Sequence, residues 1–352
     1  MAQIRTGIQE VDPRHRLEVD RLEAWVREHV EGFAGPLRVR QFVGGQSNPT
    51  YHLSDGQHEW VLRRKPPGQL VHSAHAVDRE FRVLSALAKV DFPSPRPRAY
   101  CVDERVIGTE FYVMDRIEGR ILVDQTLPGW SPEERRSLYA SQIGILAQLH
   151  ALDPEALGLG DYGKPGNYFA RQIHVWGKQY ATADVPRSTA MERLIEWLPA
   201  NVPDDPSTAI VHGDYGLNNM IVHPSEPRIV AILDWELSTL GHPLADLTYH
   251  LAGRLSPGGQ FEGLDDARLA AMGIPTRDEY VRAYCERTGR SGGIPQLDFY
   301  LAFHLFRTAG IMFGIAGRAK AGTAAGGEAS ELGKLALPLA DRALELARSL
   351  GA

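Results

Sequence analysis

Residues 212–219 read HGDYGLNN and residues 232–236 read ILDWE, with two short apolar runs, MIV and RIVAIL, beginning at 220 and 228. Asp214 and Asn219 stand five positions apart, and the two runs favour a hairpin that returns Asp234 to the same place. Phosphoryl transfer needs a carboxylate to meet the attacking hydroxyl and oxygen ligands to hold Mg²⁺ against the phosphates. We therefore predict that Asp214 is the catalytic carboxylate and that Asn219 and Asp234 bind Mg²⁺.

The alternative for these three residues is structural, because Asp and Asn in loops usually form turns and helix caps. Each residue taken alone favours that interpretation. The long combined pattern, an Asp and an Asn on one loop followed by a hairpin and an apolar-Asp-Trp-Glu sequence, favours the functional one.

This combined pattern resembles the aminoglycoside phosphotransferase family, a branch of the protein-kinase-like superfamily, over residues 36–320. Protein kinases have H-R-D-x-x-x-x-N and then D-F-G, whereas here Gly213 replaces the Arg and Trp235-Glu236 replace Phe-Gly. No A-P-E sequence follows Asp234, which favours a small-molecule kinase over a protein kinase. The resemblance implies an α+β, protein-kinase-like bilobal fold with a small antiparallel β-sheet N-lobe and a larger helical C-lobe. It also implies ATP and Mg²⁺ as cofactors.

Hydrophobic periodicity divides the chain into a β-rich part and a helical part. Asp55-Gly56, between two alternating runs, indicates a hairpin, and Gly119 marks a hinge between the parts. The elements expected in the first part are a helix over 17–33, strands within 37–63, a helix over 75–90, and strands around 98–103 and 110–115. The apolar face of the helix over 75–90 is expected to consist of Phe81, Leu84, Leu87 and Ala88. We predict three units: an N-terminal helical extension (1–35), an N-lobe (36–118) and a C-lobe (119–352).

The resemblance places the phosphate-covering loop at GGQSNPTY, between two strands, where glycines and small polar residues let backbone N–H groups approach phosphates. A plain hairpin turn is the alternative. The residues expected to contact the nucleotide there are Gly45, Gln46, Ser47 and Asn48. The run FYVMDRI resembles the strand and hinge that hold adenine, with Met114 at the back of the pocket and backbone groups near Asp115 and Ile117 as the contacts.

The strand EWVLR matches the one that carries the family's phosphate-binding cation. Alternation puts Val61 and Arg63 on one face, so Val61 would cover the adenine and Arg63 would reach the phosphates. Arg64 and Lys65 are alternatives, either as that cation or as a solvated strand end. Glu80, in the next helix, resembles the ion-pair partner of the cation, with a surface carboxylate as the alternative.

Helices dominate after residue 119. Ser131 with Glu134, and Thr276 with Glu279, form capping boxes that start two of them. Further helices are expected over 166–181, 188–199, 243–254, 296–318 and 331–350, with a small polar loop over 321–330. Asp246 resembles a family residue that braces the catalytic loop, His212 supports the same loop by hydrogen bonding, and Glu236 is a candidate further metal carboxylate.

Composition excludes several classes of protein. The 352 residues carry 38 Lys and Arg against 44 Asp and Glu, a net charge of -6, which argues against a nucleic-acid or membrane-surface partner. The only cysteines, Cys101 and Cys285, exclude a disulfide framework and zinc-type spacing. No run approaches the ~18 apolar residues of a membrane span, and the N-terminus lacks an apolar signal region. We expect a cytoplasmic protein, and a homodimer is left open.

The acceptor is expected to be a small-molecule hydroxyl. The region YLAFHLFRTAGIMFGIAGRAKAG is apolar but carries Arg307, Arg318 and Lys320, which suit an anionic or acyl-linked acceptor better than a polycation. Core packing is the alternative role of this stripe. Together with VLRRKPPG, the region resembles kinase-like domains fused to, or encoded near, acyl-CoA dehydrogenases, which implies a hydroxy acid or hydroxyacyl-CoA substrate.

Three other functions stay open at this point: a true aminoglycoside kinase, a nucleotide-binding pseudokinase that acts as a regulatory module, and a protein kinase. The intact set of Asp214, Asn219 and Asp234 argues against a pseudokinase, because a binding module does not need all three. A hydrolase is disfavoured, because the sequence has no G-x-S-x-G.

Overall fold

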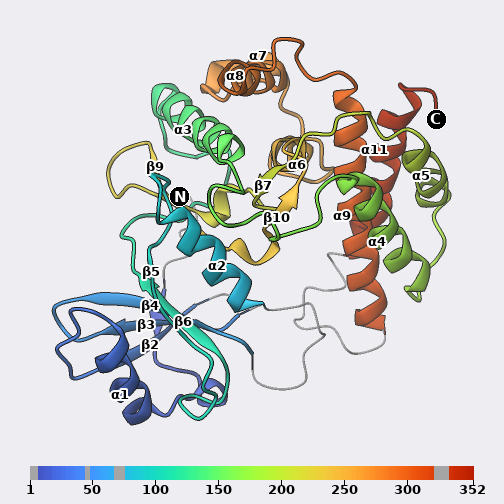
Figure 1. Cartoon of the computed structure of the whole chain (residues 1–352). Coiled ribbons are helices and arrows are strands. Elements are labelled where there is room, and N and C mark those ends of the chain that lie inside the picture. Colours follow the sequence, from blue (N-terminus) through green and yellow to red (C-terminus); the bar gives the residue numbers. More distant parts are fainter. Residues whose placement is uncertain (1–6, 44–47, 67–75, 321–332) are drawn as a thin grey trace.

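The computed structural model describes residues 7–43, 48–66, 76–320 and 333–352, which form a β-rich lobe and a helical lobe (Figure 1). The β-rich lobe contains one six-stranded sheet in the order β1-β2-β3-β4-β6-β5, and every neighbouring pair is antiparallel. Its strands are β1 (Ile8–Gln9), β2 (Arg38–Phe42), β3 (Thr50–Ser54), β4 (Glu59–Arg64), β5 (Pro97–Cys101) and β6 (Phe111–Asp115). This is the predicted antiparallel N-lobe sheet.

The predicted hairpin at Asp55-Gly56 is confirmed and joins β3 to β4. Asp55 Oδ1 accepts hydrogen bonds from the backbone N–H of Gln57 at 2.8 Å and of His58 at 2.7 Å, and Gly56 takes a φ of +92°. An acceptor side chain followed by a glycine with positive φ therefore closes the turn.

The two faces of the sheet belong to different cores. Trp60 and Leu62 of β4 pack with Leu22 and Val26 of helix α1 (Val19–His29), whereas Val61 belongs to the larger cluster that continues into the helical lobe. Alternation along β4 therefore turns its odd-numbered residues toward helix α2 (Val77–Leu87) and the second lobe.

The apolar face of α2 differs in part from the predicted one. Leu84 and Leu87 are buried as expected, but Phe81 is only half-buried and Ala88 is exposed. Val83 takes the inward position instead, because the helix also turns Glu80 into the protein.

Gly119 lies where the chain passes between the lobes. The next residue, Arg120, exchanges two backbone hydrogen bonds of 2.7 and 2.8 Å with Val222. A Cβ at position 119 would lie 2.4 Å from the carbonyl oxygen of Val222, so only glycine permits this approach. At the predicted hinge, the segment between the lobes thus contacts the hairpin formed by β8 (Met220–Val222) and β9 (Ile229–Ile232) closely.

The helical lobe begins at the predicted capping box of Ser131 and Glu134, and the second capping box, Thr276 with Glu279, also forms as predicted. Its helices are α3 (Pro132–Ala151), α4 (Tyr168–Thr182), α5 (Thr189–Ala200), α6 (Leu244–Arg254), α7 (Asp266–Met272), α8 (Arg277–Thr288), α9 (Leu297–Lys320) and α11 (Ala336–Arg348). Its strands form two antiparallel pairs, β7 (Ala209–Val211) with β10 (Thr239–Gly241), and β8 (Met220–Val222) with β9 (Ile229–Ile232). The hairpin β8–β9 was predicted, whereas α7 and the pair β7–β10 were not.

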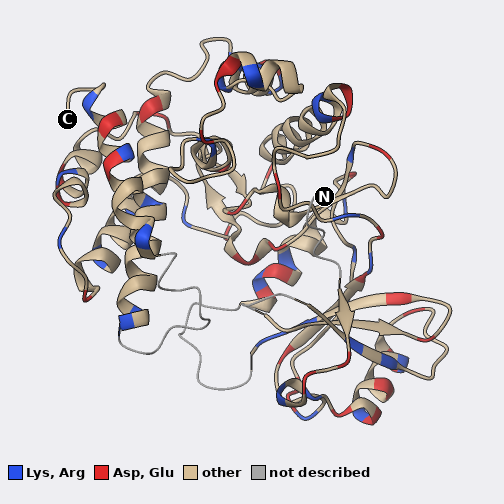
Figure 2. Cartoon of the chain, turned by 180° about the vertical axis from the view of Figure 1, so that it is seen from behind, with Lys and Arg blue, Asp and Glu red and all other residues tan. Residues whose placement is uncertain are grey.

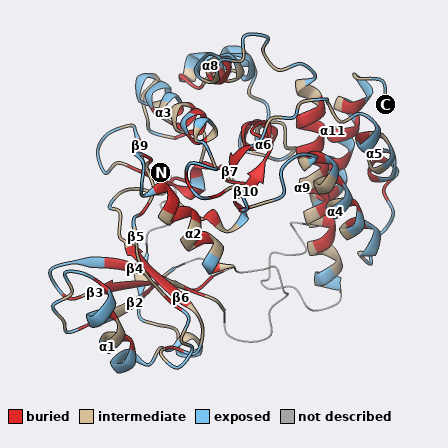
Figure 3. Ribbon diagram, in the orientation of Figure 1, coloured by how far each residue is buried: buried red, intermediate tan, exposed pale blue. Residues whose placement is uncertain are grey.

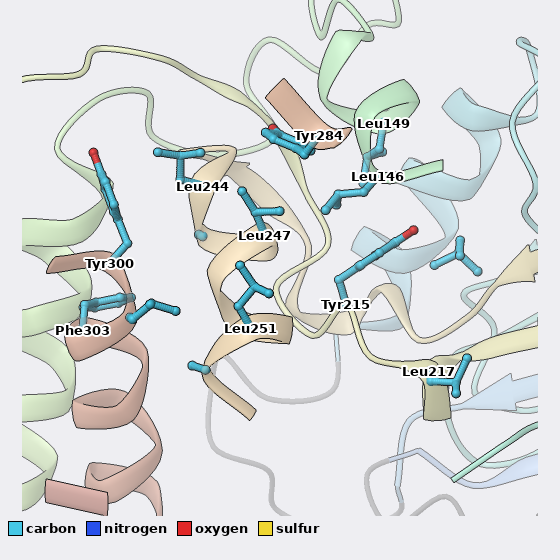
Figure 4. Packing of buried hydrophobic residues seen from close by; sticks show 14 of the residues in the cluster. Leu146, Leu149, Tyr215, Leu217, Leu244, Leu247, Leu251, Tyr284, Tyr300 and Phe303 are labelled. Carbon is cyan, nitrogen blue, oxygen red and sulfur yellow. The ribbon is translucent and has the colours of Figure 1, made fainter. Parts of the chain in front are cut away.

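Helix α6 occupies the centre of this lobe, where burial is densest (Figure 3). Leu247 and Leu251 lie between Phe303 of α9 on one side and Leu146 of α3 on the other (Figure 4). A helix packed on opposite sides has little freedom to move, so the residues at its N-terminal end are well placed to hold a neighbouring loop.

Helix α9 is long and apolar enough to cross a membrane by length and composition, although no such segment was expected. However, 67% of its most apolar window is buried inside the protein, where it contacts α4, α6 and α11, and core helices pass the same test. Positively charged Lys and Arg are interspersed with negatively charged Asp and Glu over both lobes of the described chain (Figure 2). Cys101 and Cys285 are both free and buried.

Candidate active site

Asp246, in the first turn of α6, binds the backbone of the loop 212–219. Its carboxylate accepts hydrogen bonds from the backbone N–H of His212 at 2.6 Å and of Gly213 at 2.8 Å, and it lies 3.3 Å from His150 Nε2. Burial alone would raise the pKa of Asp246, but these hydrogen-bond donors lower it below its ordinary value. Asp246 therefore acts as a buried anion that fixes the loop backbone, as predicted.

Gly213 explains why this loop has H-G-D where protein kinases have H-R-D. Its φ is +85°, and a Cβ there would lie 2.7 Å from the carbonyl oxygen of Leu237. Both the conformation and the space therefore require glycine at this position.

His212 connects the loop to the segment that carries Asp234. Its Nδ1 accepts from the backbone N–H of Asp214 at 3.2 Å, so the ring proton lies on Nε2, which donates to the carbonyl of Leu233 at 2.8 Å. The backbone N–H of Leu233 in turn donates to the carbonyl of Asn219 at 2.8 Å. The predicted supporting role of His212 is confirmed, and Asp214, Asn219 and Asp234 converge on one place.

Both carboxylate oxygens of Asp214 accept hydrogen bonds. Asn219 Nδ2 donates to Oδ2 at 2.8 Å and to the carbonyl of Asp214 at 3.0 Å, and the Tyr249 hydroxyl donates to Oδ1. Burial, and then the neighbouring Asp214, raise the pKa of the Tyr249 phenol, so it keeps its proton and stays a donor. The side chain of Asp214 is therefore held in one orientation.

Sequence reasoning missed Tyr249, which lies 35 positions after Asp214. A signal was present, because Tyr249 follows Asp246 by three positions and so lies on the same face of α6. One face of α6 thus holds both the backbone of the loop and the side chain of Asp214.

Arg63 of β4 joins the two lobes. Its Nη1 lies 3.0 Å from Glu80 Oε1 of α2, its Nη2 lies 3.0 Å from Asp234 Oδ1, and Glu236 is 4.0 Å away. Burial alone would lower the pKa of the Arg63 guanidinium, but the Glu80 carboxylate outweighs it and raises the pKa above its ordinary value. Arg63 is therefore a permanent cation, and Glu80, 1% exposed, is a buried ion-pair partner and not a surface carboxylate.

The two alternative cations point elsewhere. Arg64 is 3% exposed and lies against the ring of Tyr51 on the opposite face of the sheet, so it is not a solvated strand end. Lys65 Nζ pairs with Glu110 at 2.6 Å. Of the three candidates, Arg63 is the one that contacts Asp234, and it lies on the face of the sheet that is turned toward the helical lobe.

With this geometry established, comparison with known proteins identifies the family. Residues 38–299 match the model of the phosphotransferase enzyme family. The chain belongs to this family. A crystal structure from Ralstonia eutropha JMP134, provisionally named an aminoglycoside phosphotransferase, is 48% identical, with a TM-score of 0.87 over 95% of this chain and 99% of that chain. The predicted family and the kinase-like α+β fold are confirmed.

Acyl-CoA dehydrogenase family member 11 of Homo sapiens is 40% identical over 348 residues, which cover 97% of this phosphotransferase chain and 45% of that protein. The chain thus spans about half the length of the curated relative it matches, and the predicted subgroup is confirmed. A thermostable mutant of aminoglycoside phosphotransferase APH(4)-Ia, solved with AMP-PNP and hygromycin B, is 17% identical with a TM-score of 0.60 over 92% of this chain and 98% of that one, a likeness of fold.

The side chains near Asp234 include oxygen donors of the kind that bind hard cations. Among the described residues no group of three or more His, Cys, Asp or Glu could hold a metal. An amide oxygen from Asn219 and a carboxylate from Asp234, completed by phosphate and water, is nevertheless the kind of set that Mg²⁺ prefers. The Asp234 side chain is 33% exposed, so it is open to a ligand, whereas Asn219 Oδ1 accepts a 3.1 Å hydrogen bond from Asn218 that metal binding would displace.

Asp234 also has an unusual backbone, with φ 66° and ψ 62°. This left-handed conformation is one that Asp tolerates better than most residues. It turns the chain sharply between β9 and the following 3₁₀ turn, Trp235–Leu237, and presents the carboxylate to Arg63.

The predicted nucleotide-contacting residues are brought together in part. Val61 and Met114 are paired across β4 and β6 and are both buried on the face turned toward the second lobe. The N–H of Asp115 donates to the carbonyl of Arg96 at 2.9 Å, and its carboxylate pairs with Arg98 at 2.5 Å. The predicted adenine contact through backbone groups near Asp115 stays a prediction. Ile117, just beyond β6, is half-buried.

Asn48 is buried at the end of the predicted phosphate loop, where its Nδ2 donates to Glu236 Oε2 at 3.1 Å. This contact ties the loop to the segment that carries Asp234. Gly45, Gln46 and Ser47, and the predicted loop at 321–330, lie outside the described residues. A separate hollow of about 540 Å³ beside α8, lined by Val281 and Cys285 among others, includes none of the predicted site residues.

Proposed function

We propose that this chain transfers the γ-phosphoryl group of ATP to a hydroxyl of a small-molecule metabolite, a hydroxy acid or a hydroxyacyl-CoA. The observation that carries the proposal is the convergence of two pre-arranged units: the carboxylate of Asp214, held by two donors, and the cation Arg63, held between Glu80 and Asp234. A pure binding module has no need of a carboxylate fixed in this way.

In the proposed reaction Asp214 receives the acceptor's O–H. Each carboxylate oxygen has two lone-pair positions, so the bonds from Asn219 and Tyr249 leave room for a further donor. As the acceptor oxygen attacks the γ-phosphorus, the bond to the β-γ bridging oxygen breaks, ADP leaves, and Asp214 takes the acceptor's proton. Positioning and electrostatics supply most of the rate gain in such reactions.

In this proposal, residues of both lobes help to neutralise the negative charge of the ATP phosphates. Arg63 would lie against the phosphate oxygens while Glu80 keeps its guanidinium oriented. Asn219 and Asp234 would hold Mg²⁺, whose chemistry when bound is to neutralise negative charge on the phosphate groups. Binding of ATP in the APH(4)-Ia neighbour's manner is supported by its AMP-PNP complex.

The acceptor class rests on the relatives and on local charge. Human acyl-CoA dehydrogenase family member 11 suggests an acyl-linked acceptor by its name. The described residues around Asp214 on α4 and α9 offer an arginine, Arg307, where a site for polycationic aminoglycosides would need carboxylates. This favours the hydroxyacyl proposal over a true aminoglycoside kinase.

The test compares the wild-type protein with Asp214→Asn in Mg²⁺-dependent ATP consumption, with phosphorylated products followed by ³¹P NMR. The acceptors are hydroxyacyl-CoAs, free hydroxy acids, an aminoglycoside and a generic protein. Asp204→Asn is the matched control, because it makes the same change at an exposed loop position. We expect Asp214→Asn to lose at least about 10²-fold in turnover, the usual scale of a general base, while Asp204→Asn keeps the wild-type rate.

A wild-type rate in Asp214→Asn would remove that residue from the mechanism. ATP binding without any product across the panel would favour the pseudokinase. Turnover of the aminoglycoside alone would overturn the acceptor proposed here while leaving the phosphotransfer intact.

A further inference from the structure

Arg307, near the middle of α9, lies beside the catalytic base. Its Cζ is 5.6 Å from the ring centroid of Trp176 on α4 and 5.6 Å from that of Tyr249 on α6. Its Nη2 donates to the carbonyl of Gly213 at 3.3 Å, one residue before Asp214. The helices α4 and α6 both pack against α9 (Figure 1). Together they place the Arg307 guanidinium near two aromatic rings and beside the loop that carries Asp214.

Arg307 forms no ion pair with any residue that the structure describes. No carboxylate of the described residues lies within 4.0 Å of its nitrogens, and its Nε is buried without a hydrogen-bond partner. Lys320, on the same helix, differs because it pairs with Asp184 at 2.7 Å. A guanidinium presents a planar fork of N–H donors that matches carboxylate and phosphate groups, so a half-buried one without a carboxylate partner is suited to bind an anionic ligand.

The titratable groups around Arg307 supply no direct ion-pair partner among the described residues. His304 is kept neutral, because burial and then Arg307 itself lower its pKa to about 3. Burial also raises the pKa values of the Tyr168 and Tyr249 phenols, which are therefore uncharged. Asp246 is occupied by the backbone of the catalytic loop. A carboxylate or phosphate of a bound ligand would therefore be the first direct ion-pair partner of Arg307 among the groups described.

Bracing of the loop is the competing role. The contact with Gly213 uses one of the five N–H donors of the guanidinium, and at 3.3 Å it is a long one. The rings of Trp176 and Tyr249 suit contact with the flat face of the guanidinium. The N–H groups at its edge then remain available for an anion. The unused donors and the missing counter-ion are not explained by bracing.

We propose that Arg307 binds an anionic group of the acceptor, a carboxylate or a phosphate, while Asp214 receives the acceptor's hydroxyl proton. This proposal rests on the phosphotransferase function proposed above and adds a specificity-determining residue to it. It also predicts that the enzyme discriminates between anionic and neutral acceptors of the same shape.

The test uses matched acceptor pairs with wild type, Arg307→Gln and Arg307→Lys. One pair is a hydroxy acid and its primary amide, which differ in the carboxylate. The other is a hydroxyacyl-CoA and the corresponding pantetheine thioester, which lacks the nucleotide phosphates. Together the pairs separate the two sources of the anion. Arg193→Gln makes the same kind of substitution at an exposed arginine of α5, which the proposal gives no role in binding, and is the control.

We expect Arg307→Gln to lower kcat/KM for the anionic member of one pair by about 10- to 100-fold, the scale of a charge-assisted bidentate contact. The neutral member should change by less than about threefold, so that selectivity is lost, and Arg307→Lys should retain part of it. Arg193→Gln should behave as wild type, and ATP binding should be unchanged in all variants.

Equal losses for both members of each pair would show that Arg307 only braces the loop, and would overturn the proposal. So would a wild-type enzyme that does not discriminate within either pair. The increase in melting temperature that each acceptor causes in the presence of ADP measures acceptor binding without phosphoryl transfer. If the anionic members stabilise wild type no more than their neutral partners, the anion site is refuted. Anion-dependent binding without phosphorylation would instead refute the proposed function alone.

Discussion

Tyr249→Phe removes one hydroxyl from the catalytic site and little else. The lost bond is the one from the phenol to Asp214 Oδ1, while the two bonds from Asn219, at 2.8 and 3.0 Å, remain. The ring keeps its places beside Arg307 and His304. The substitution therefore tests whether the second anchor of the carboxylate contributes to catalysis.

The size of the effect follows from the type of bond. A hydrogen bond to a charged group contributes about 1.5–3 kcal/mol, and each 1.36 kcal/mol of barrier is tenfold in rate. If that contribution acts on the orientation of the base, kcat falls by roughly 10- to 150-fold. KM for ATP should stay within about twofold, because Tyr249 lies on α6 and not on β4 or β6, where we propose that the nucleotide binds.

The chain offers a matched control in Tyr100→Phe. The Tyr100 hydroxyl also donates to a carboxylate, Glu110 Oε2 at 2.5 Å, but on β5 in the N-lobe, remote from the catalytic loop. Both variants are assayed for kcat, KM and thermal unfolding under the same conditions. Similar losses of stability with a fall in kcat confined to Tyr249→Phe support the positioning role.

The reasoning is refuted if Tyr249→Phe lowers kcat no more than Tyr100→Phe does. It is also refuted if the fall in kcat disappears under conditions that restore the melting temperature of the variant. Either result would mean that Asn219 alone orients the base.

Two further predictions concern stability. Gly213→Ala introduces a Cβ 2.7 Å from the carbonyl of Leu237 at a φ of +85°, so we expect a loss of about 1–3 kcal/mol in the free energy of unfolding together with reduced activity, measured by urea denaturation and the kinase assay. His304 has a pKa of about 3 in the folded protein against 6.5 ordinarily. Between those values only the unfolded chain binds the proton, so the free energy of unfolding falls as pH drops from about 6.5, by up to ~1.4 kcal/mol per unit. His304→Phe should reduce that slope in urea titrations at several pH values, and an unchanged slope would contradict the buried neutral histidine.

Elements with local signals could be predicted from sequence. The two capping boxes, Ser131 with Glu134 and Thr276 with Glu279, start their helices where expected, because the atoms that form each box are three residues apart. The turn at Asp55-Gly56 and the hairpin β8–β9 are local for the same reason. Such interactions form within one segment and depend little on the rest of the chain.

Elements that depend on distant partners could not be predicted. The strands β7 and β10 have three residues each and are separated by the whole catalytic loop and hairpin, so neither carries a detectable period. The inward face of α2 was misjudged at Phe81 and Ala88, because a charged residue, Glu80, takes a buried position that hydrophobicity alone assigns to apolar side chains.

The candidate site divides in the same way. The sequence by itself determined which chemical groups are present and their spacing on one loop, Asp214, Asn219 and, after a hairpin, Asp234. Only the tertiary structure decided that Arg63, and not its neighbours Arg64 and Lys65, meets Glu80, because the strand's alternation must be anchored to a particular side of the sheet. It likewise decided that Tyr249 reaches the base, since that contact requires α6 to be packed under the loop. Spacing along the chain is set by covalent bonds, whereas contacts across it are set by the packing of a whole core.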